Sequence, residues 1–159
     1  MRVRTLLADC DIRTANVVDA ADVVYLTQRA YAEPYRAGTP VLFVDEDEES
    51  LARDMDAGWR MLVAHYGGLA VGAVRFRGDG EGVRVARLVV HPLHRRRGIA
   101  AALLRSVEQE AASRGLHQLA TEVPADRGLV EFLEHRGFAQ RSERTVGPLR
   151  FVSLAKALA

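Results

Sequence analysis

Residues 88–104, which read LVVHPLHRRRGIAAALL, connect two different hydrophobic patterns through a short basic loop. The continuous apolar residues before Pro92 predict the buried end of a strand. After the loop, Ile99, Leu103 and Val107 recur at helical spacing and predict an amphipathic helix. The stretch therefore predicts a strand, a basic loop and a helix in that order.

The start of this helix has the features of an anion-binding site. The first turn of a helix leaves backbone N–H groups without partners and carries a partial positive charge. Gly98 and Ala100 leave that backbone uncovered, and Arg95, Arg96 and Arg97 add positive charge. These residues predict a phosphate or pyrophosphate site. The P-loop and the G-x-G-x-x-G fingerprint are both absent, and a helix with a solvated basic start is the alternative interpretation.

Outside this stretch, some segments have hydrophobic residues at helical spacing and others have the pattern of strands. This order predicts a mixed α+β or α/β domain. Two glycines at residues 67–68 predict a hairpin turn. The acidic residues Asp45–Glu49 predict the start of a helix, because the helix dipole favours negative charge there. The expected helices cover residues 19–31, 48–58, 98–114 and 126–135, and the expected strands cover residues 12–16, 60–66, 69–77, 83–90, 116–123, 138–144 and 149–154.

Length and composition predict one folded domain over residues 1–159. The chain has 159 residues, 48% hydrophobic, with a formal net charge of +1. The balanced charge disfavours nucleic acid and acidic membranes as partners. Cys10 is the sole cysteine, so neither an internal disulfide nor a cysteine-rich zinc site is expected, and no metal is predicted. No apolar run reaches the about 20 residues of a membrane span, and we expect a cytoplasmic protein.

Two segments resemble the GNAT N-acetyltransferase superfamily. The sequence RRRGIA at Arg95–Ala100 matches the R/Q-x-x-G-x-G/A signature of that family, and Glu131–Phe138 is similar to its later helix-to-strand segment ending in Gly-Phe. The order of the expected elements agrees with the GNAT core from about Ile12 to Leu158. The resemblance implies an α/β (α+β) fold. Its mixed, mostly antiparallel central sheet would have six to seven strands, about four helices and a splayed strand pair.

The resemblance also implies an acyl-CoA site, most often for acetyl-CoA as co-substrate. The diphosphate would bind the backbone N–H groups of residues 96–101. The pantetheine arm would lie beside the end of the 83–90 strand, where that strand and the 116–123 strand splay apart. A backbone N–H near Val90 would polarise the thioester carbonyl. The expected cofactor-binding residues are Leu88, Val89, Val90, Arg95, Arg96, Arg97, Gly98, Ile99, Ala100, Ala101, Asp126 and Phe132.

The usual catalytic side chains of the family are missing. An attacking amine must lose a proton, because its pKa is about 10.4, and the departing thiolate needs one. The family's usual Glu base corresponds to Arg87, and its usual Tyr acid corresponds to Leu133. The remaining candidates are Glu122, His91 and Tyr35.

Each of these candidates also has an ordinary structural interpretation. Glu122 could be a solvent-facing strand residue, His91 an exposed or structural histidine, and Tyr35 an anchoring aromatic. We expect proximity and the backbone amide to supply most of the rate, with a water chain leading to Glu122 as catalytic proton acceptor and Tyr35 lining the acceptor pocket.

Two charged features bear on the acceptor. Arg87 could hold a carboxylate or phosphate of the acceptor, or it could point away from the pocket, because a bulge would change the strand phase. The acidic residues Asp45–Glu49 could attract a cationic acceptor, although a solvated helix start is the simpler interpretation.

The leading hypothesis is an acetyl-CoA-dependent N-acetyltransferase acting on a primary amine of a small molecule or peptide. One alternative is a catalytically inactive acyl-CoA-binding sensor or scaffold, which the missing Glu and Tyr suggest. A structural domain without a CoA site and a nucleic-acid binder are less consistent with the sequence, because the arginine triplet adjoins an uncovered backbone and has no interleaved aromatics. The two late strands, residues 138–144 and 149–154, could pair across a homodimer.

Overall fold

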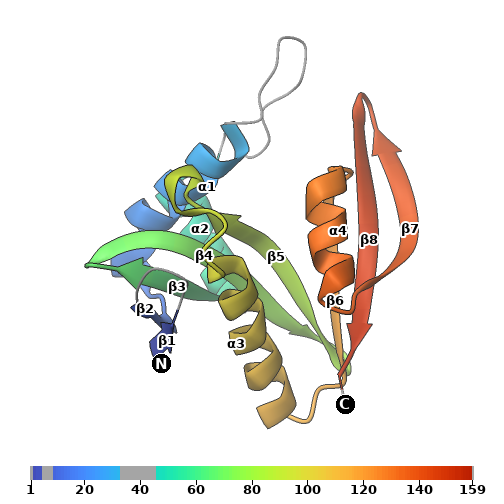
Figure 1. Ribbon diagram of the computed structural model, residues 1–159, viewed down its shortest axis with the longest axis horizontal. Helices are drawn as coiled ribbons and strands as arrows, with labels where there is room; N and C mark the ends of the chain where they lie inside the picture. The colour runs from blue at the N-terminus through green and yellow to red at the C-terminus, as the bar shows by residue number, and fades with distance from the viewer. Residues whose placement is uncertain (1, 5–8, 33–45, 159) are drawn as a thin grey trace. The chain divides into compact units, whose positions relative to one another are not determined.

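The computed structural model describes residues 2–4, 9–32 and 46–158 (Figure 1). Hydrophobic periodicity and capping residues define its elements. Among the described residues the helices are α1 (Ala20–Ala32), α2 (Glu48–Asp56), α3 (Ile99–Ser113) and α4 (Arg127–His135), with 3-10 turns η1 (Val17–Asp19) and η2 (Pro92–His94). The strands are β1 (Arg2–Arg4), β2 (Asp9–Thr14), β3 (Arg60–Tyr66), β4 (Leu69–Asp79), β5 (Gly82–Val90), β6 (Gln118–Pro124), β7 (Ala139–Val146) and β8 (Leu149–Ala157).

Hydrogen bonding links the strands in the order β1-β2-β3-β4-β5-β6-β8-β7. The neighbours β1–β2, β2–β3, β3–β4, β6–β8 and β7–β8 pair antiparallel. In contrast, β5 and β6 pair in parallel, and only over Gly82–Val85 and Gln118–Thr121, although β5 continues to Val90 and β6 to Pro124. The expected mixed, mostly antiparallel sheet with four helices is confirmed.

The structure differs from the sequence-based expectation at the start of the chain. Arg2–Arg4 forms β1, which pairs with β2 and adds one strand to the seven expected segments, and β2 begins at Asp9 rather than Ile12. A three-residue strand has too few residues to show a period, and its ladder with β2 is a tertiary pairing. Local sequence therefore carried no signal for it.

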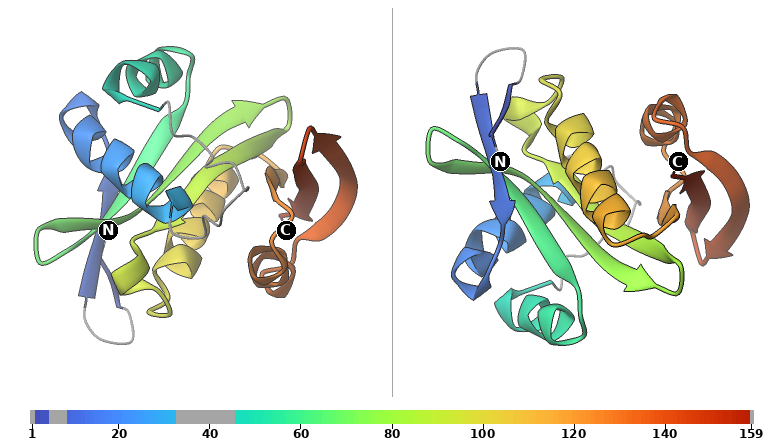
Figure 2. Two further views of the ribbon diagram at one scale, coloured as in Figure 1. Left: turned by 90° about the horizontal axis from the view of Figure 1, so that it is seen from above. Right: turned by 90° about the horizontal axis from the view of Figure 1, so that it is seen from below.

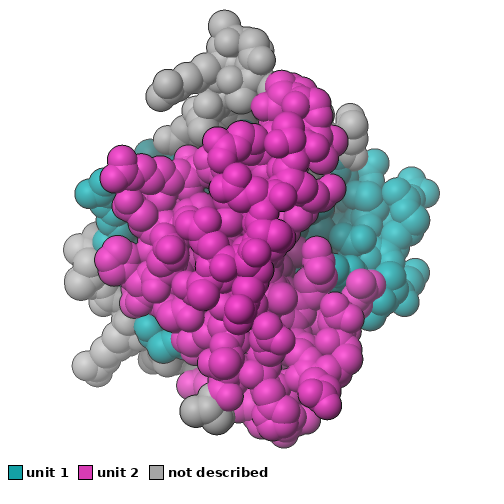
Figure 3. Space-filling model, turned by 90° about the vertical axis from the view of Figure 1, so that its right-hand side faces the viewer, with its two compact units in different colours: residues 1–76, 87–106 teal, residues 77–86, 107–159 magenta. Residues whose placement is uncertain are grey.

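The chain divides into two compact units (Figure 3). The first comprises residues 1–76 and 87–106, and the second comprises residues 77–86 and 107–159. The helix α3 and the strands β4 and β5 each contribute residues to both units. Among the described residues, no helix has the length and apolar character needed to cross a membrane.

In the first unit, α1 and α2 cover one face of the strands, and the first half of α3 covers the other (Figure 2). The core on the α1–α2 face includes Leu26, Leu51, Met61 and Val63, all at or below 1% exposure. Val89 of β5 belongs to the same cluster. Burial of such side chains supplies the main stabilisation of this layer, at about 1.5–3 kcal/mol for each.

The opposite face brings α3 close to β4. A Cβ added at Gly72 would lie 2.9 Å from Cγ2 of Ile99 and 3.2 Å from the carbonyl oxygen of Val89. The contact at Gly72 therefore sets the distance between the first turn of α3 and the strands beside it. This position requires glycine because of the space available, since its backbone φ is not positive.

In the second unit, α4 lies beside β6, β8 and β7 (Figure 1). Leu119 and Leu154 of the sheet and Leu133 of α4 are buried, whereas every residue of β7 is exposed. The helix begins where the Asp126 side chain accepts a hydrogen bond from Leu129 N–H at 2.9 Å, as the sequence predicted for this N-cap.

We predict that Gly72→Ala lowers the free energy of unfolding by about 1–3 kcal/mol, because the new methyl group overlaps Ile99 and approaches a backbone oxygen. Urea denaturation monitored by circular dichroism measures the change. The matched control is Gly78→Ala on the same strand, where no heavy atom lies within 4 Å of the added Cβ. Equal stability of the two variants would contradict the close contact.

Asp19 provides a pH-dependent contribution to stability. Burial favours its neutral form, but the hydrogen bond from Asn16 N–H at 2.9 Å and the Arg13 guanidinium at 2.8 Å together lower the pKa of Asp19. Because the folded pKa lies below the unfolded one, this stabilisation is present above the unfolded pKa of about 3.9 and is lost as the pH falls through the folded pKa.

We predict that Asp19→Asn lowers the free energy of unfolding by about 1–3 kcal/mol at pH 7, and that the difference from wild type shrinks below pH 4. Urea titrations at both pH values measure it. The exposed Asp22→Asn variant in the first turn of α1 is the control, with an expected change of about 0.5 kcal/mol or less. A difference for Asp19→Asn that is independent of pH would contradict the proposed ion pair.

Candidate active site

The segment between β5 and α3 is held by short local hydrogen bonds. The N–H of His91 donates to Val71 O at 2.8 Å, which anchors the end of β5 to β4. His91 Nδ1 then accepts from Leu93 N–H at 3.2 Å and begins the η2 turn. The N–H of His94 donates to His91 O at 2.8 Å. This turn reverses the chain just before the arginines.

The backbone after η2 is arranged to present N–H groups. Arg96 and Gly98 have positive φ angles of 64° and 80° on either side of Arg97. Alternating signs of φ are typical of backbone concavities that bind anions. The first intrahelical bond of α3 runs from Ala102 N–H to Gly98 O at 3.0 Å, so the N–H groups of residues 99–101 have no partner within the helix.

Access and charge complete the expected anion site. A Cβ at Gly98 would meet no heavy atom within 4 Å, so the backbone is open on that side. Arg95 and Arg96 are exposed. Arg95 Nε donates to Val90 O at 3.4 Å, and Arg97 Nη1 lies 3.1 Å from His94 Nδ1. Burial, Arg97 and His91 lower the pKa of His94, so the positive charge here comes mainly from the arginines.

The other expected site residues lie elsewhere in the chain. Glu122, Asp126 and Phe132 belong to the second unit, and Tyr35 lies outside the described residues. Asp126 caps α4, and Phe132 has the Arg136 guanidinium 5.3 Å from its ring centroid. No group of three or more His, Cys, Asp or Glu side chains among the described residues is arranged to hold a metal ion.

Glu122 is bound to an arginine. Its carboxylate accepts hydrogen bonds from Arg144 Nε at 2.8 Å and Nη2 at 2.6 Å, and Ser153 Oγ lies at 3.4 Å. The hydrogen bonds from Arg144 hold the pKa of Glu122 below its usual range. The carboxylate is therefore ionised at neutral pH, and its affinity for a proton is reduced.

The two positions that the resemblance aligns with the family's usual catalytic residues, Leu133 and Arg87, have distinct surroundings. Leu133 is only 2% exposed and packs in the core of the second unit. Arg87 has a φ of 52° within β5, which is a local irregularity of the strand. His91 lies with its ring centroid 6.2 Å from that of Tyr25 and 5.6 Å from that of His94.

A buried ion-pair group was not predicted from the sequence. Arg75 is 2% exposed and lies between two carboxylates, with Nη1 2.9 Å from Asp54 Oδ2 and Nη2 against Glu46 Oε1. Asp47 is the N-cap of α2, and Glu48 and Glu49 form its first turn, as the acidic residues predicted, but the Glu46 side chain is 8% exposed rather than solvated. The sequence signal for this ion-pair group was Arg75 itself, which lies within the apolar run of β4. A charge buried there needs a partner of opposite charge.

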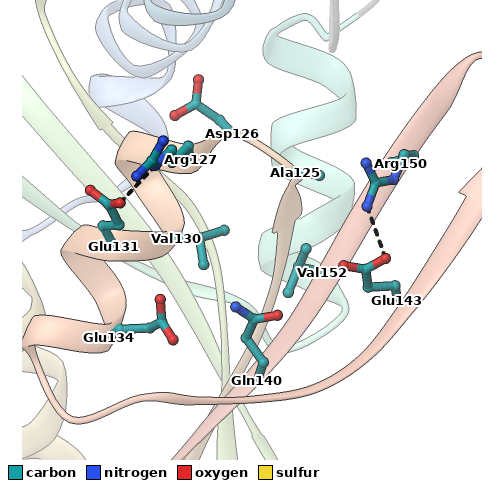
Figure 4. Close-up of a pocket in the computed structure, with 10 residues that line it drawn as sticks. All are labelled: Ala125, Asp126, Arg127, Val130, Glu131, Glu134, Gln140, Glu143, Arg150 and Val152. Carbon is teal, nitrogen blue, oxygen red and sulfur yellow. Dashed lines mark hydrogen bonds and ion pairs between the residues drawn. The ribbon is translucent and has the colours of Figure 1, made fainter.

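A shallow pocket of about 260 Å³ lies between α4 and the β7–β8 hairpin (Figure 4). Both of its arginines are paired with lining carboxylates. Arg127 Nε lies 2.9 Å from Glu131, and Arg150 Nη2 lies 3.0 Å from Glu143. Asp126 and Glu134 also line it, so the pocket has no surplus positive charge for a phosphate.

Known structures share this arrangement of elements. The family model of the acetyltransferase (GNAT) domain matches residues 12–158 of this chain. A PaiA N-acetyltransferase from Thermoplasma acidophilum, in complex with coenzyme A, has a TM-score of 0.79 at 16% identity, covering 94% of this chain and 99% of that one.

Two further structures are similar to the same degree. The ribosomal-protein-S18-alanine N-acetyltransferase from Escherichia coli has a TM-score of 0.77 at 20% identity, covering 93% of each chain. The putative acetyltransferase YncA from Salmonella typhimurium, with its cofactor acetyl-CoA, has a TM-score of 0.71 at 20% identity, covering 94% of each chain. At these identities the structural likeness shows the fold, whereas the domain match extends over almost the whole chain. This chain therefore belongs to the GNAT acetyltransferase family.

Proposed function

We propose that this protein is an N-acetyltransferase that moves an acetyl group from acetyl-CoA to a primary amine of a small molecule or peptide. The observation that supports this proposal is the start of α3, which has positive φ angles at Arg96 and Gly98 and three N–H groups without helical partners. The donor set fits a diphosphate, because N–H groups and guanidinium groups both donate to phosphate oxygens. Two of the fold relatives contain coenzyme A or acetyl-CoA, which supports the same donor.

Within this proposal, different residues bind different parts of the cofactor. Arg95–Ala101 bind the diphosphate, and Leu88–Val90 present strand backbone along the pantetheine arm. Asp126 and Phe132 are further proposed contacts to the cofactor. Acetyl-CoA supplies an activated thioester carbonyl, and a backbone N–H near Val90 donates to its oxygen as negative charge develops.

The reaction requires direct attack in a ternary complex. The amine nitrogen forms a C–N bond to the carbonyl carbon, the C–S bond breaks, and the nitrogen gives up one proton while the thiolate gains one. Holding the amine beside the thioester supplies much of the rate. We propose that a water chain carries the proton from the amine towards Glu122 and that Tyr35 lines the acceptor pocket.

A second candidate is an acyl-CoA-binding sensor or scaffold without catalysis. The observation in its favour is that a buried leucine and a strained arginine, Leu133 and Arg87, stand where the family commonly has its acid and base. Both candidates require acetyl-CoA binding, so turnover with any primary amine separates them.

We predict that the wild-type protein binds acetyl-CoA with a micromolar dissociation constant and that Gly98→Asp weakens binding at least about tenfold, measured by calorimetric titration. The aspartate places negative charge where the diphosphate should bind. Gly98→Ala is the matched control, because it has the same unfavourable positive φ without the charge and meets no neighbour. Absence of binding by the wild-type protein would refute both candidates.

We predict that Glu122→Gln lowers kcat/KM by about 100-fold with the best amine from a screen, because the proton acceptor is lost. In Arg144→Gln the pKa of Glu122 rises toward its usual value, so the acid limb of the kcat/KM profile shifts to higher pH. Glu143→Gln removes a similar surface pair, with Arg150, and serves as the control. An unchanged kcat/KM at every pH in Glu122→Gln would exclude the proposed role.

A further inference from the structure

A side-chain bridge between His94 and Arg97 crosses the basic turn before α3, residues 95–98. Arg97 Nη1 lies 3.1 Å from His94 Nδ1, and both residues belong to the first unit. Between them in the chain, Arg96 has a φ of 64°, a backbone conformation that is unfavourable for a residue with a side chain. Such a conformation persists only where neighbouring contacts hold it, and the bridge joins the residues on either side of the strained arginine.

The chemistry of the two groups assigns the proton of His94. A guanidinium group has N–H donors and no acceptor, so His94 Nδ1 must accept, and the neutral ring carries its proton on Nε2. A protonated His94 would present an N–H donor to Arg97, and the contact would become a repulsion between two cations. The bridge therefore exists only while His94 is neutral.

The surroundings of His94 favour this neutral form. Its ring centroid lies 5.6 Å from that of His91, the N-cap of η2, and 6.1 Å from that of Tyr66 at the end of β3. These two rings and the Arg97 guanidinium are the titratable and charged groups that face it. Burial, Arg97 and His91 lower the pKa of His94, so the bridge is complete at neutral pH.

We propose that neutral His94 is a positioning residue for the basic turn, so that acetyl-CoA binding weakens when His94 takes up a proton. This inference rests on the proposed function, which assigns the turn to the diphosphate. Because the bridge helps to hold the positive φ of Arg96, the N–H groups that follow are arranged before the ligand arrives. The bridge is lost as the pH falls through the lowered pKa of His94, below about 6.5. If His94 served instead as a cation for phosphate, protonation would strengthen binding.

The test measures the dissociation constant of acetyl-CoA by calorimetric titration at about pH 7.5 and about pH 5. In His94→Asn, an amide oxygen replaces Nδ1 as acceptor and does not titrate. We expect the dissociation constants of this variant and the wild type to agree at about pH 7.5. At about pH 5 the wild type should bind at least about threefold more weakly than the variant, because only the wild type loses the bridge. Comparison at equal pH cancels the titration of the ligand's own phosphates.

Two further variants separate the bridge from ring packing. His94→Phe keeps an aromatic ring without the acceptor, so binding at about pH 7.5 weakens about three- to tenfold. In an Arg97→Leu background, which lacks the donor, the same substitution should have almost no effect. The matched control is His117→Asn, at an exposed histidine before β6, which should follow the wild type at both pH values.

Nitrogen-15 NMR of the ligand-free protein observes the ring directly, and we expect neutral His94 to carry its proton on Nε2. A proton on Nδ1, or the same ratio of wild-type to His94→Asn dissociation constants at both pH values, overturns the inference. Tighter binding by the wild type than by His94→Asn at low pH also overturns it. These outcomes leave acetyl-CoA binding intact, whereas absence of binding by the wild type overturns the proposed function together with this role, so the two failures are distinguishable.

Discussion

The close approach of α3 to β4 at Gly72 is the constraint on which the candidate site depends. There is no room for a side chain between Ile99 and the Val89 carbonyl, so the first turn of α3 lies directly against the strands. His91 N–H, bonded to Val71 O, anchors the end of β5 two residues further along. These two contacts place the N-terminus of a helix beside the end of a strand. A ligand that contacts both the N-terminus of α3 and the end of β5 must therefore match the distance between them.

Two charged regions of the first unit have opposite electrostatic surroundings. The start of α3 is open, carries exposed arginines and relies on backbone N–H groups that water can satisfy until a ligand arrives. In contrast, Arg75 is 2% exposed, and its charge is neutralised by Glu46 and Asp54. Removing one partner from such a pair costs more than the pair contributes, because the remaining charge stays buried. The ion pairs of Arg75 therefore join β4 to α2 and to Glu46 just before it.

Membership of the GNAT family supports acetyl transfer as the chemistry. The resemblance aligns Arg87 and Leu133 with the common base and acid, and neither residue suits those roles, because Arg87 is a cation with a positive φ and Leu133 is a core side chain. The bidentate hydrogen bonds from Arg144 also reduce the proton affinity of Glu122.

Periodicity and capping residues alone determined most of the secondary structure and the position of the basic turn before α3. Residues 60–66 and 127–135 form the expected strand and helix, and the glycine and arginines before α3 stand where the sequence placed them. These features are local, because a helix start, a cap or a hairpin depends on residues close together in the chain. Only the tertiary structure decided the β1 pairing, the positive φ of Arg87, and the burial of Glu46 against Arg75. Those outcomes depend on how strands pair and on which residue of a strand faces each side. They also depend on charges that lie far apart in the sequence, and no local pattern encodes either of these.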